Sequence, residues 1–243
     1  MSARFWQHLA LPLLCMSAVS VVACDRQETP DRTTAASGFP QPHRPVSPII
    51  GNQFSSEAKR DRAGEAQEVM DRSGVVPGMT VADIGAGNGY YTVRLAERVG
   101  AGGRVLAQDI DPAAIRALGE RIVREQIDNV SIVTGTPSDP RLPSGSFDRI
   151  FLVHMYHEVA QPYAFVWNMI PALKKGGAII VVETDRPTDR HGIPPRLLAC
   201  EFRAIGLKLT EYIVRPELGG YYARFEPTNA RPEPRAIKAC PAA

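Results

Sequence analysis

Residues 80–91 read TVADIGAGNGYY, and the fold of the chain follows from this stretch. An apolar, strand-like run at residues 80–84 passes directly into a glycine-rich turn, and a helix-like run begins near Tyr90. Glycines are needed where the backbone takes positive φ or lets a ligand come close, and the amides that start the next helix are hydrogen-bond donors. This strand–turn–helix junction is therefore the expected ligand site of an α/β fold.

Around this junction, apolar runs alternate with amphipathic runs. Strands are expected at residues 80–84, 104–108, 130–134, 147–153, 178–183, 208–214 and 221–225, and helices at 56–72, 91–99, 112–125, 163–173 and 195–205. This alternation predicts a doubly wound, mostly parallel sheet. Pro112 suits the first turn of its helix, and Gly176-Gly177 suits a helix end before a buried strand. Only residues 215–220 separate the last two strands, so these should form an antiparallel hairpin.

Two other nucleotide-binding folds fit this junction less well. The dinucleotide fingerprint requires its third glycine one position later, where this chain has Tyr90. No Gly-Lys-Ser or Gly-Lys-Thr follows the turn, which excludes a P-loop. The second strand leads to Asp109, whose carboxylate is placed to accept hydrogen bonds from the ribose hydroxyls of an adenosine ligand. Asp111 is the alternative on the same side of an extended chain, although Asp111-Pro112 looks more like a helix start.

Four segments match, in order and spacing, the successive motifs of class I S-adenosylmethionine-dependent methyltransferases. They are residues 81–92, residues 109–112 (DIDP), residues 139–148 (DPRLPSGSFD) and residues 173–177 (LKKGG). The chain resembles this family from about residue 60 to residue 225, including the final hairpin. The resemblance implies S-adenosylmethionine as the cofactor. It also implies an α/β fold with a seven-stranded sheet of order 3-2-1-4-5-7-6, in which the last strand is antiparallel.

The resemblance also assigns cofactor-binding residues position by position. The methionine part would lie against Asp83 and the turn made of Gly85, Ala86, Gly87, Asn88 and Gly89, and the ribose against Asp109, with Ile110 beside it. In many members an acidic residue directly follows the glycine that ends the third strand and pairs with the adenine amino group. Here Gly135 is followed by Thr136, so Asp139 is the residue expected in that role.

The segment after the fourth strand, residues 153–158 (VHMYHE), is where the family places residues that face the methyl group and the acceptor. His157 is the candidate catalytic residue, because a histidine accepts a proton at neutral pH. In the alternative interpretation His154 and His157 are packed and hydrogen-bonded at the strand end, and Tyr156 lines the pocket.

Each of two further segments has two alternative interpretations. Asp185-Arg186 and residues 191–194 follow the fifth strand at the same sheet edge, either as acceptor contacts or as a solvated loop. The charged stretch at residues 57–62 is either a solvated helix face or a lid over the pocket.

The two ends of the chain differ in composition from the middle. Arg4 and the short apolar run at residues 9–23 predict a signal peptide at residues 1–23. Val21-Val22-Ala23-Cys24 resembles a bacterial lipobox, which implies a lipidated Cys24 that anchors the protein to a membrane; a plain signal peptide with an incidental cysteine is the alternative. Residues 24–51 are expected to be a disordered linker, 52–226 the methyltransferase domain, and 227–243 a disordered tail.

The length, net charge and cysteine content of the chain limit the kinds of partner and metal that we expect it to bind. The length of 243 residues suits one α/β domain, and a net charge of +2 gives no electrostatic reason to expect nucleic acid. Cys200 and Cys240 remain after the two N-terminal cysteines, and their pairing is left open. No Cys/His spacing has a zinc pattern, so no metal is expected.

The sequence therefore predicts methyl transfer to a small-molecule or lipid acceptor that it does not identify. It also predicts an exported, membrane-anchored lipoprotein on the periplasmic side. These two predictions conflict, because S-adenosylmethionine is made in the cytosol. The second hypothesis is accordingly an extracytoplasmic binding module that keeps the fold without turnover.

Overall fold

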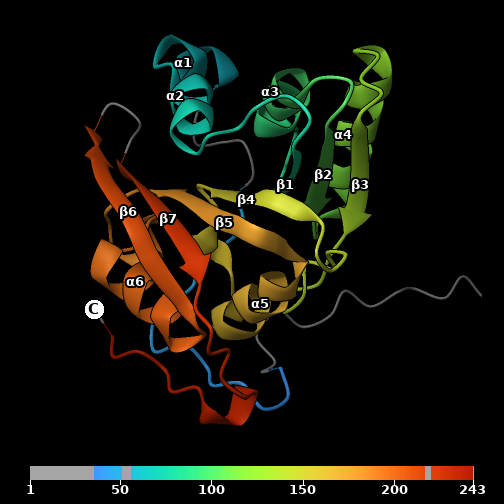
Figure 1. Ribbon diagram of the computed structural model, residues 1–243. Helices are drawn as coiled ribbons and strands as arrows, with labels where there is room; N and C mark the ends of the chain where they lie inside the picture. Colours follow the sequence, from blue (N-terminus) through green and yellow to red (C-terminus); the bar gives the residue numbers. More distant parts are fainter. Residues whose placement is uncertain (1–35, 51–55, 217–219, 243) are drawn as a thin grey trace, which may run out of the picture.

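The computed structural model describes residues 36–50, 56–216 and 220–242, which are built on a seven-stranded sheet of order β3-β2-β1-β4-β5-β7-β6 (Figure 1). The parallel strands are β1 Thr80–Ile84, β2 Arg104–Asp109, β3 Val130–Thr134, β4 Phe147–Val153 and β5 Leu173–Glu183. Strand β7, Gly220–Pro227, is antiparallel both to β5 and to β6, Leu207–Arg215. The expected strand order and antiparallel last strand are confirmed.

Helices cover both faces of the sheet (Figure 1). Helices α2 Glu65–Arg72, α3 Tyr90–Val99 and α4 Pro112–Arg124 lie on one face, and α5 Pro162–Met169 and α6 Pro195–Ala204 on the other. In β1, Val81 packs toward α2 and α3, whereas Ala82 and Ile84 pack toward α5 and α6. Burial on both faces explains why the central strands are nearly continuous apolar runs.

The helix expected at residues 56–72 is two helices, because the chain turns at Gly64. Helix α1, Glu57–Arg62, is capped by Ser56, whose hydroxyl accepts a hydrogen bond from the Lys59 amide at 3.3 Å. Gly64 has φ of 67°, a left-handed conformation that ends α1 and precedes α2. The charge pattern of the segment does not indicate this break, whereas Gly64 does.

The prediction that Gly176-Gly177 ends a helix before a strand is wrong. Both glycines lie inside β5, next to a register shift between β4 and β5 at Phe147 and Arg149. A Cβ atom on Gly177 would lie 2.8 Å from the Phe147 carbonyl oxygen, so this glycine permits a close approach of two strands. A short helical turn, Ile170–Ala172, leads directly into β5 instead.

The prediction of a disordered tail at residues 227–243 is wrong for residues 227–242. Ile237 and Cys240 are buried against α5 and α6, and Cys240 forms a disulfide with Cys200 of α6. The indole of Trp167 donates a hydrogen bond to the Pro232 carbonyl oxygen at 2.9 Å. The proline-rich composition suggested a solvated coil, but a few apolar anchors and one covalent link are enough to fix the segment.

The linker expected at residues 24–51 is likewise ordered at residues 36–50, which run beside the C-terminal segment below α5 and α6 (Figure 1). The guanidinium of Arg44 pairs with the Glu201 carboxylate at 2.9 Å, and both side chains are almost fully buried. Tyr156 donates a hydrogen bond to the other carboxylate oxygen of Glu201 at 2.8 Å. These contacts attach the segment to α6 through polar groups rather than apolar ones.

The expected signal peptide and Cys24 lie outside the described residues. Among the helices that the structure describes, none has the length and apolar character needed to cross a bilayer.

Replacing Arg44 by Met should lower the free energy of unfolding by about 3 to 5 kcal/mol, because Glu201 then stays buried without its cationic partner. Urea unfolding followed by circular dichroism measures the change. Arg203→Met, at an exposed position of α6, is the matched control and should have little effect. A loss below 1 kcal/mol for Arg44→Met would mean that the N-terminal segment is not anchored by this pair.

Candidate active site

A cavity of about 440 Å³ opens at the carboxyl ends of the parallel strands. This volume falls in the range of small-molecule sites. Its walls come from the turns and loops after β1 to β5, from α1 and α2, and from Ile49 and Ile50 of the N-terminal segment. The loops that follow parallel strands in sequence thus meet in one place, as expected for an open α/β sheet.

The turn after β1 depends on three glycines with positive φ: Gly85 (66°), Gly87 (54°) and Gly89 (84°). The amide of Ala86 donates a hydrogen bond to the Gln108 carbonyl oxygen at 2.9 Å, which holds the turn against β2. Gly85, Ala86 and Gly87 line the cavity. Asn88 is exposed, and neither Asn88 nor Gly89 lines it.

Gly89 is instead a packing glycine. A Cβ atom at this position would lie 2.4 Å from Cδ1 of Leu118 in α4. The missing side chain lets α4 come close to the start of α3. The expectation that every residue of the turn contacts the ligand is therefore not matched by the geometry.

Asp83 ends up buried at the base of the cavity, with 3% of its surface exposed. Its Oδ2 accepts a hydrogen bond from the Thr92 hydroxyl at 2.6 Å. Burial raises the pKa of this carboxyl to about 6, an effect that the Thr92 hydrogen bond and the nearby Arg60 only partly offset. Asp83 is thus a carboxylate that a cationic ligand would stabilise.

Asp109 and Asp111 are separated by the structure. Asp109 lines the cavity with Ile110, and its carboxylate accepts hydrogen bonds from the amides of Gly87 (2.9 Å), Ile110 (2.7 Å) and Asp111 (3.0 Å). Asp111 caps α4 by accepting from the Ala113 amide at 2.8 Å, and it lies outside the cavity. Asp109 therefore connects the end of β2 to the glycine turn.

Asp139 is not part of the cavity wall. Its carboxylate accepts from the Arg141 amide at 2.7 Å and its backbone bridges to Thr136, so it shapes a turn. Thr136 and Pro137 line the cavity in its place. Thr136, the residue directly after Gly135, therefore lines the cavity at the position where many family members have an acidic residue.

Gln108 is a cavity residue that the sequence reasoning missed. Its side chain is buried, and its Oε1 finds no hydrogen-bond partner within the described part of the chain. Buried amide oxygens are normally paired, so a ligand donor is the natural partner here. A polar residue between the apolar run Val105-Leu106-Ala107 and Asp109 was the available signal.

Helices α1 and α2 form a wall of the cavity through Lys59, Arg60, Ala63 and Glu65. Burial by itself raises the pKa of the Glu65 carboxyl. Hydrogen bonds from His154 and Arg60 outweigh this effect and bring the pKa down to about 2. Arg60 also lies 3.8 Å from the ring centroid of Tyr90. Lys59 and Arg60 line the cavity, whereas Asp61 and Arg62 are exposed and no residue of α1 is buried, so this stretch combines a cavity wall with a solvated face.

At the opposite end of the cavity lies His157, with 4% of its surface exposed. Its Nδ1 lies 2.9 Å and 3.0 Å from the two carboxylate oxygens of the fully buried Glu183. Glu183 thus holds the ring with Nδ1–H toward β5. Tyr156, expected to line the pocket, is buried against Glu201 instead.

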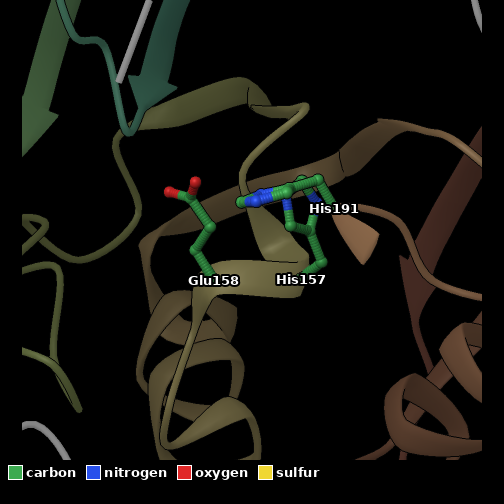
Figure 2. A group of neighbouring side chains, drawn as sticks. All are labelled: His157, Glu158 and His191. Carbon is green, nitrogen blue, oxygen red and sulfur yellow. The ribbon is translucent and has the colours of Figure 1, made fainter. Parts of the chain in front are cut away.

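The loop after β5 contributes Thr184, Arg186 and His191 to the cavity wall. Asp185 and Ile193 do not line it, and Ile193 is fully buried in the core. His157, Glu158 and His191 come together here, with one donor atom of each within 4.8 Å of the others (Figure 2). The spacing of residues in the sequence did not indicate a metal site. The structure explains why, since two different loops supply these three groups.

Asp83→Asn should stabilise the protein more at high pH than at low pH. The folded-state pKa of about 6 lies above the ordinary aspartate pKa of 3.8, so the wild type loses stability as pH rises through this window, whereas the amide does not titrate. The advantage of the variant should grow by about 1 kcal/mol between pH 5 and pH 7.5 in urea unfolding. Asp111→Asn is the exposed control, and a pH-independent advantage would contradict a raised pKa.

Comparisons with known proteins agree with this geometry. Residues 81–177 match the family model described as a methyltransferase domain. The demethylmenaquinone methyltransferase of Geobacillus sp. is 25% identical over 122 residues, covering 50% of this chain and 52% of that protein. The ubiquinone/menaquinone biosynthesis C-methyltransferase of Idiomarina loihiensis is 32% identical over 120 residues, covering 49% and 47%. The chain thus spans about half the length of these curated relatives.

Among solved structures, a SAM-dependent methyltransferase from Aquifex aeolicus has the same fold. The TM-score is 0.60 at 19% identity, and the match covers 70% of this chain and 97% of that one. The matched segment begins in β1, contains the glycine turn, Asp83 and Asp109, and ends in β5. Residues 81–177 therefore match a methyltransferase domain, and the sheet that contains them has the fold of that solved structure.

Proposed function

We propose that the protein binds S-adenosylmethionine in this cavity and transfers its methyl group to a small-molecule or lipid acceptor. The observation that carries the proposal is the buried Asp83 beside the glycine turn, in a cavity that continues to His157. When bound, the cofactor supplies a methyl group on a positively charged sulfur. Transfer is an in-line displacement, so the main task of the protein is to position two molecules.

The residues at the glycine turn fit the cofactor. The carboxylate of Asp83 offers negative charge to the cationic amino acid part, at a place where burial strengthens the attraction. Asp109 already accepts three backbone hydrogen bonds of the roughly four that a carboxylate takes, which leaves about one for a ribose hydroxyl. Gln108 and Thr136 are placed to accept or donate hydrogen bonds at the adenine end.

The acceptor end of the cavity is mainly apolar. Its lining includes Ile49, Ile50, Val153, Met155, Val159, Ala160 and Phe165. This lining suits an acceptor with an apolar body, and two relatives are named for methylation in quinone biosynthesis. A quinone precursor with a ring hydroxyl is therefore the acceptor class that we favour.

His157 is the proposed catalytic group at this end. The buried Glu183 orients its ring through Nδ1, and the remaining ring nitrogen, Nε2, is the atom that can take a proton from an acceptor. A module without turnover is less well supported, because the glycine turn, Asp83, Asp109 and the oriented histidine are all in place.

We further propose that the protein is exported and held at a membrane by lipid on Cys24. The signal-like run at residues 9–23 supports this location, and so does the Cys200–Cys240 disulfide, since such bonds persist mainly in oxidising compartments. An exported enzyme needs an extracytoplasmic source of the cofactor. Globomycin-sensitive processing of the precursor would test the anchor, and a Cys24→Ser protein that still partitions into membranes would contradict it.

Calorimetric titration should give one S-adenosylmethionine bound per chain. Asp109→Ala should weaken binding at least tenfold, because it removes a ligand acceptor and frees the glycine turn from β2. Asp111→Ala, the neighbouring carboxylate outside the cavity, is the matched control and should bind like the wild type. Absence of binding at millimolar ligand would refute the proposed function, and equal loss in both variants would refute the assignment of Asp109.

The affinity for S-adenosylmethionine should fall about tenfold from pH 7.5 to pH 5. The pKa of Asp83 is about 6, so acidification neutralises the carboxylate that attracts the cation. Titrations at intervals across this range give the profile. In Asp83→Asn the affinity should be lower, and this pH dependence should be absent. A variant that keeps the full pH dependence would show that another group is responsible.

Turnover separates an enzyme from a binding module. Formation of S-adenosylhomocysteine in the presence of chemically reduced demethylmenaquinone, whose quinol form carries the ring hydroxyls, would support catalysis on the favoured class, and no formation with this probe would count against it.

A further inference from the structure

Three metal-binding side chains meet at the acceptor end of the cavity. His157 and Glu158 lie in the short helical turn after β4, Tyr156–Glu158, and His191 follows the turn Thr188–Arg190 after β5. Figure 2 shows the two imidazole rings next to each other, with the Glu158 carboxylate on their flank. One donor atom of each residue lies within 4.8 Å of the others. All three residues line the cavity, so a ligand can reach them.

His157 is oriented as metal-bound histidines are. Its Nδ1 contacts both oxygens of the Glu183 carboxylate, and its backbone amide donates to the same residue at 3.2 Å. A histidine whose Nδ1–H is held by a carboxylate presents Nε2 as the ligand atom. Glu183 is fully buried in β5, so the orientation is set by the sheet.

His191 is placed by a constrained loop. The residue has a left-handed conformation, with φ of 54°, and its backbone amide contacts the Ser47 hydroxyl at 3.3 Å. A Cβ atom on the next residue, Gly192, would lie 2.5 Å from the Thr184 carbonyl oxygen, so the loop is folded tightly on itself. This folding brings the His191 ring to 5.5 Å from that of His157, centroid to centroid, with the planes at 87°.

Glu158 supplies the third group, a carboxylate with an oxygen close to a ring nitrogen of each histidine. Zinc binds histidine nitrogen and carboxylate oxygen at about 2.0 to 2.2 Å, so neighbouring donor atoms in a loaded site are about 3.5 Å apart. The cluster must therefore contract by about 1 Å. Glu158 is partly buried, and its carboxylate accepts a hydrogen bond from the Ile50 amide at 3.3 Å. In a loaded site its side chain would rotate to bring the carboxylate to the rings.

We propose that His157, Glu158 and His191 bind one Zn²⁺-like transition-metal ion, and that the methyl acceptor coordinates this ion through a hydroxyl group. Two histidines and one glutamate are the ligand set of a zinc site that keeps a fourth position open. Imidazole ligands favour zinc and its neighbours over Mg²⁺. The inference that an ion binds depends only on these three residues. The inference that the acceptor coordinates this ion depends on the proposed methyl transfer.

The ion would activate the acceptor hydroxyl. Without an ion, His157 would do this by acting as a base. A hydroxyl bound to a divalent ion has a much lower pKa, so it loses its proton to water at neutral pH. The ring carbon next to the ionised hydroxyl would then form a bond to the methyl carbon, the carbon–sulfur bond would break with its electron pair left on sulfur, and the proton on that ring carbon would pass to water. His157 would then be a ligand rather than a base, and chelation distinguishes the two roles.

The test uses the full chain after exhaustive chelation, titrated with Zn²⁺ by calorimetry and with Co²⁺ by visible absorption. We expect one ion per chain, with Co²⁺ bands typical of low coordination number and no binding of Mg²⁺. His191→Ala and Glu158→Gln should each weaken Zn²⁺ binding at least tenfold. Glu183→Gln should weaken it by about 10- to 100-fold through the orientation of His157.

His154→Ala is the matched control for metal affinity, because it removes a histidine from the same cavity outside the cluster. S-adenosylmethionine titration of every variant checks folding and the proposed function separately. Cofactor binding without a stoichiometric metal ion would overturn this inference alone, as would equal metal affinity in His191→Ala and wild type. Metal binding without cofactor binding would leave the ion in place and refute the proposed methyl transfer.

Discussion

The structure depends on the close approach of three elements where β1 ends. Gly85, Gly87 and Gly89 all have positive φ, and Gly89 leaves room for Leu118 of α4. With any side chain at Gly89, the Leu118 side chain would have to shift, and the positive φ of 84° would strain the new residue. The same turn brings Asp83 and Asp109 to one cavity. Backbone geometry at this single junction thus creates both the packing and the site.

Around that junction the protein buries several charges and pairs most of them. Glu65 is held ionised by Arg60 and His154, and Glu183 is held against His157. Asp83 is different, because its main partner is the neutral Thr92 hydroxyl and its pKa is raised. Paired charges fix the walls of the cavity, whereas the poorly compensated carboxylate is the group that would attract a cationic ligand.

The segments outside the sheet have a functional consequence as well. Residues 36–50 are attached through the buried Arg44–Glu201 pair, and the same segment delivers Ile49 and Ile50 to the acceptor end. The C-terminal segment is fixed by the Cys200–Cys240 disulfide and by Ile237. Both segments were expected to be disordered from their composition. Composition averages over a segment, while a few specific contacts decide whether it is ordered.

The sequence by itself determined the alternation of strands and helices, the final hairpin and the glycine junction, because period, turn residues and motif spacing are local properties that the chain carries in order. The strand order was implied by the resemblance to class I methyltransferases. The sequence also placed Asp83, Asp109 and His157 at strand ends. Only the tertiary structure decided that Asp109 rather than Asp111 lines the cavity, that Thr136 and Gln108 do so while Asp139 does not, and that His191 meets His157. These outcomes depend on how separate loops pack against each other, and a side chain's direction at a loop is set by contacts far away in the sequence.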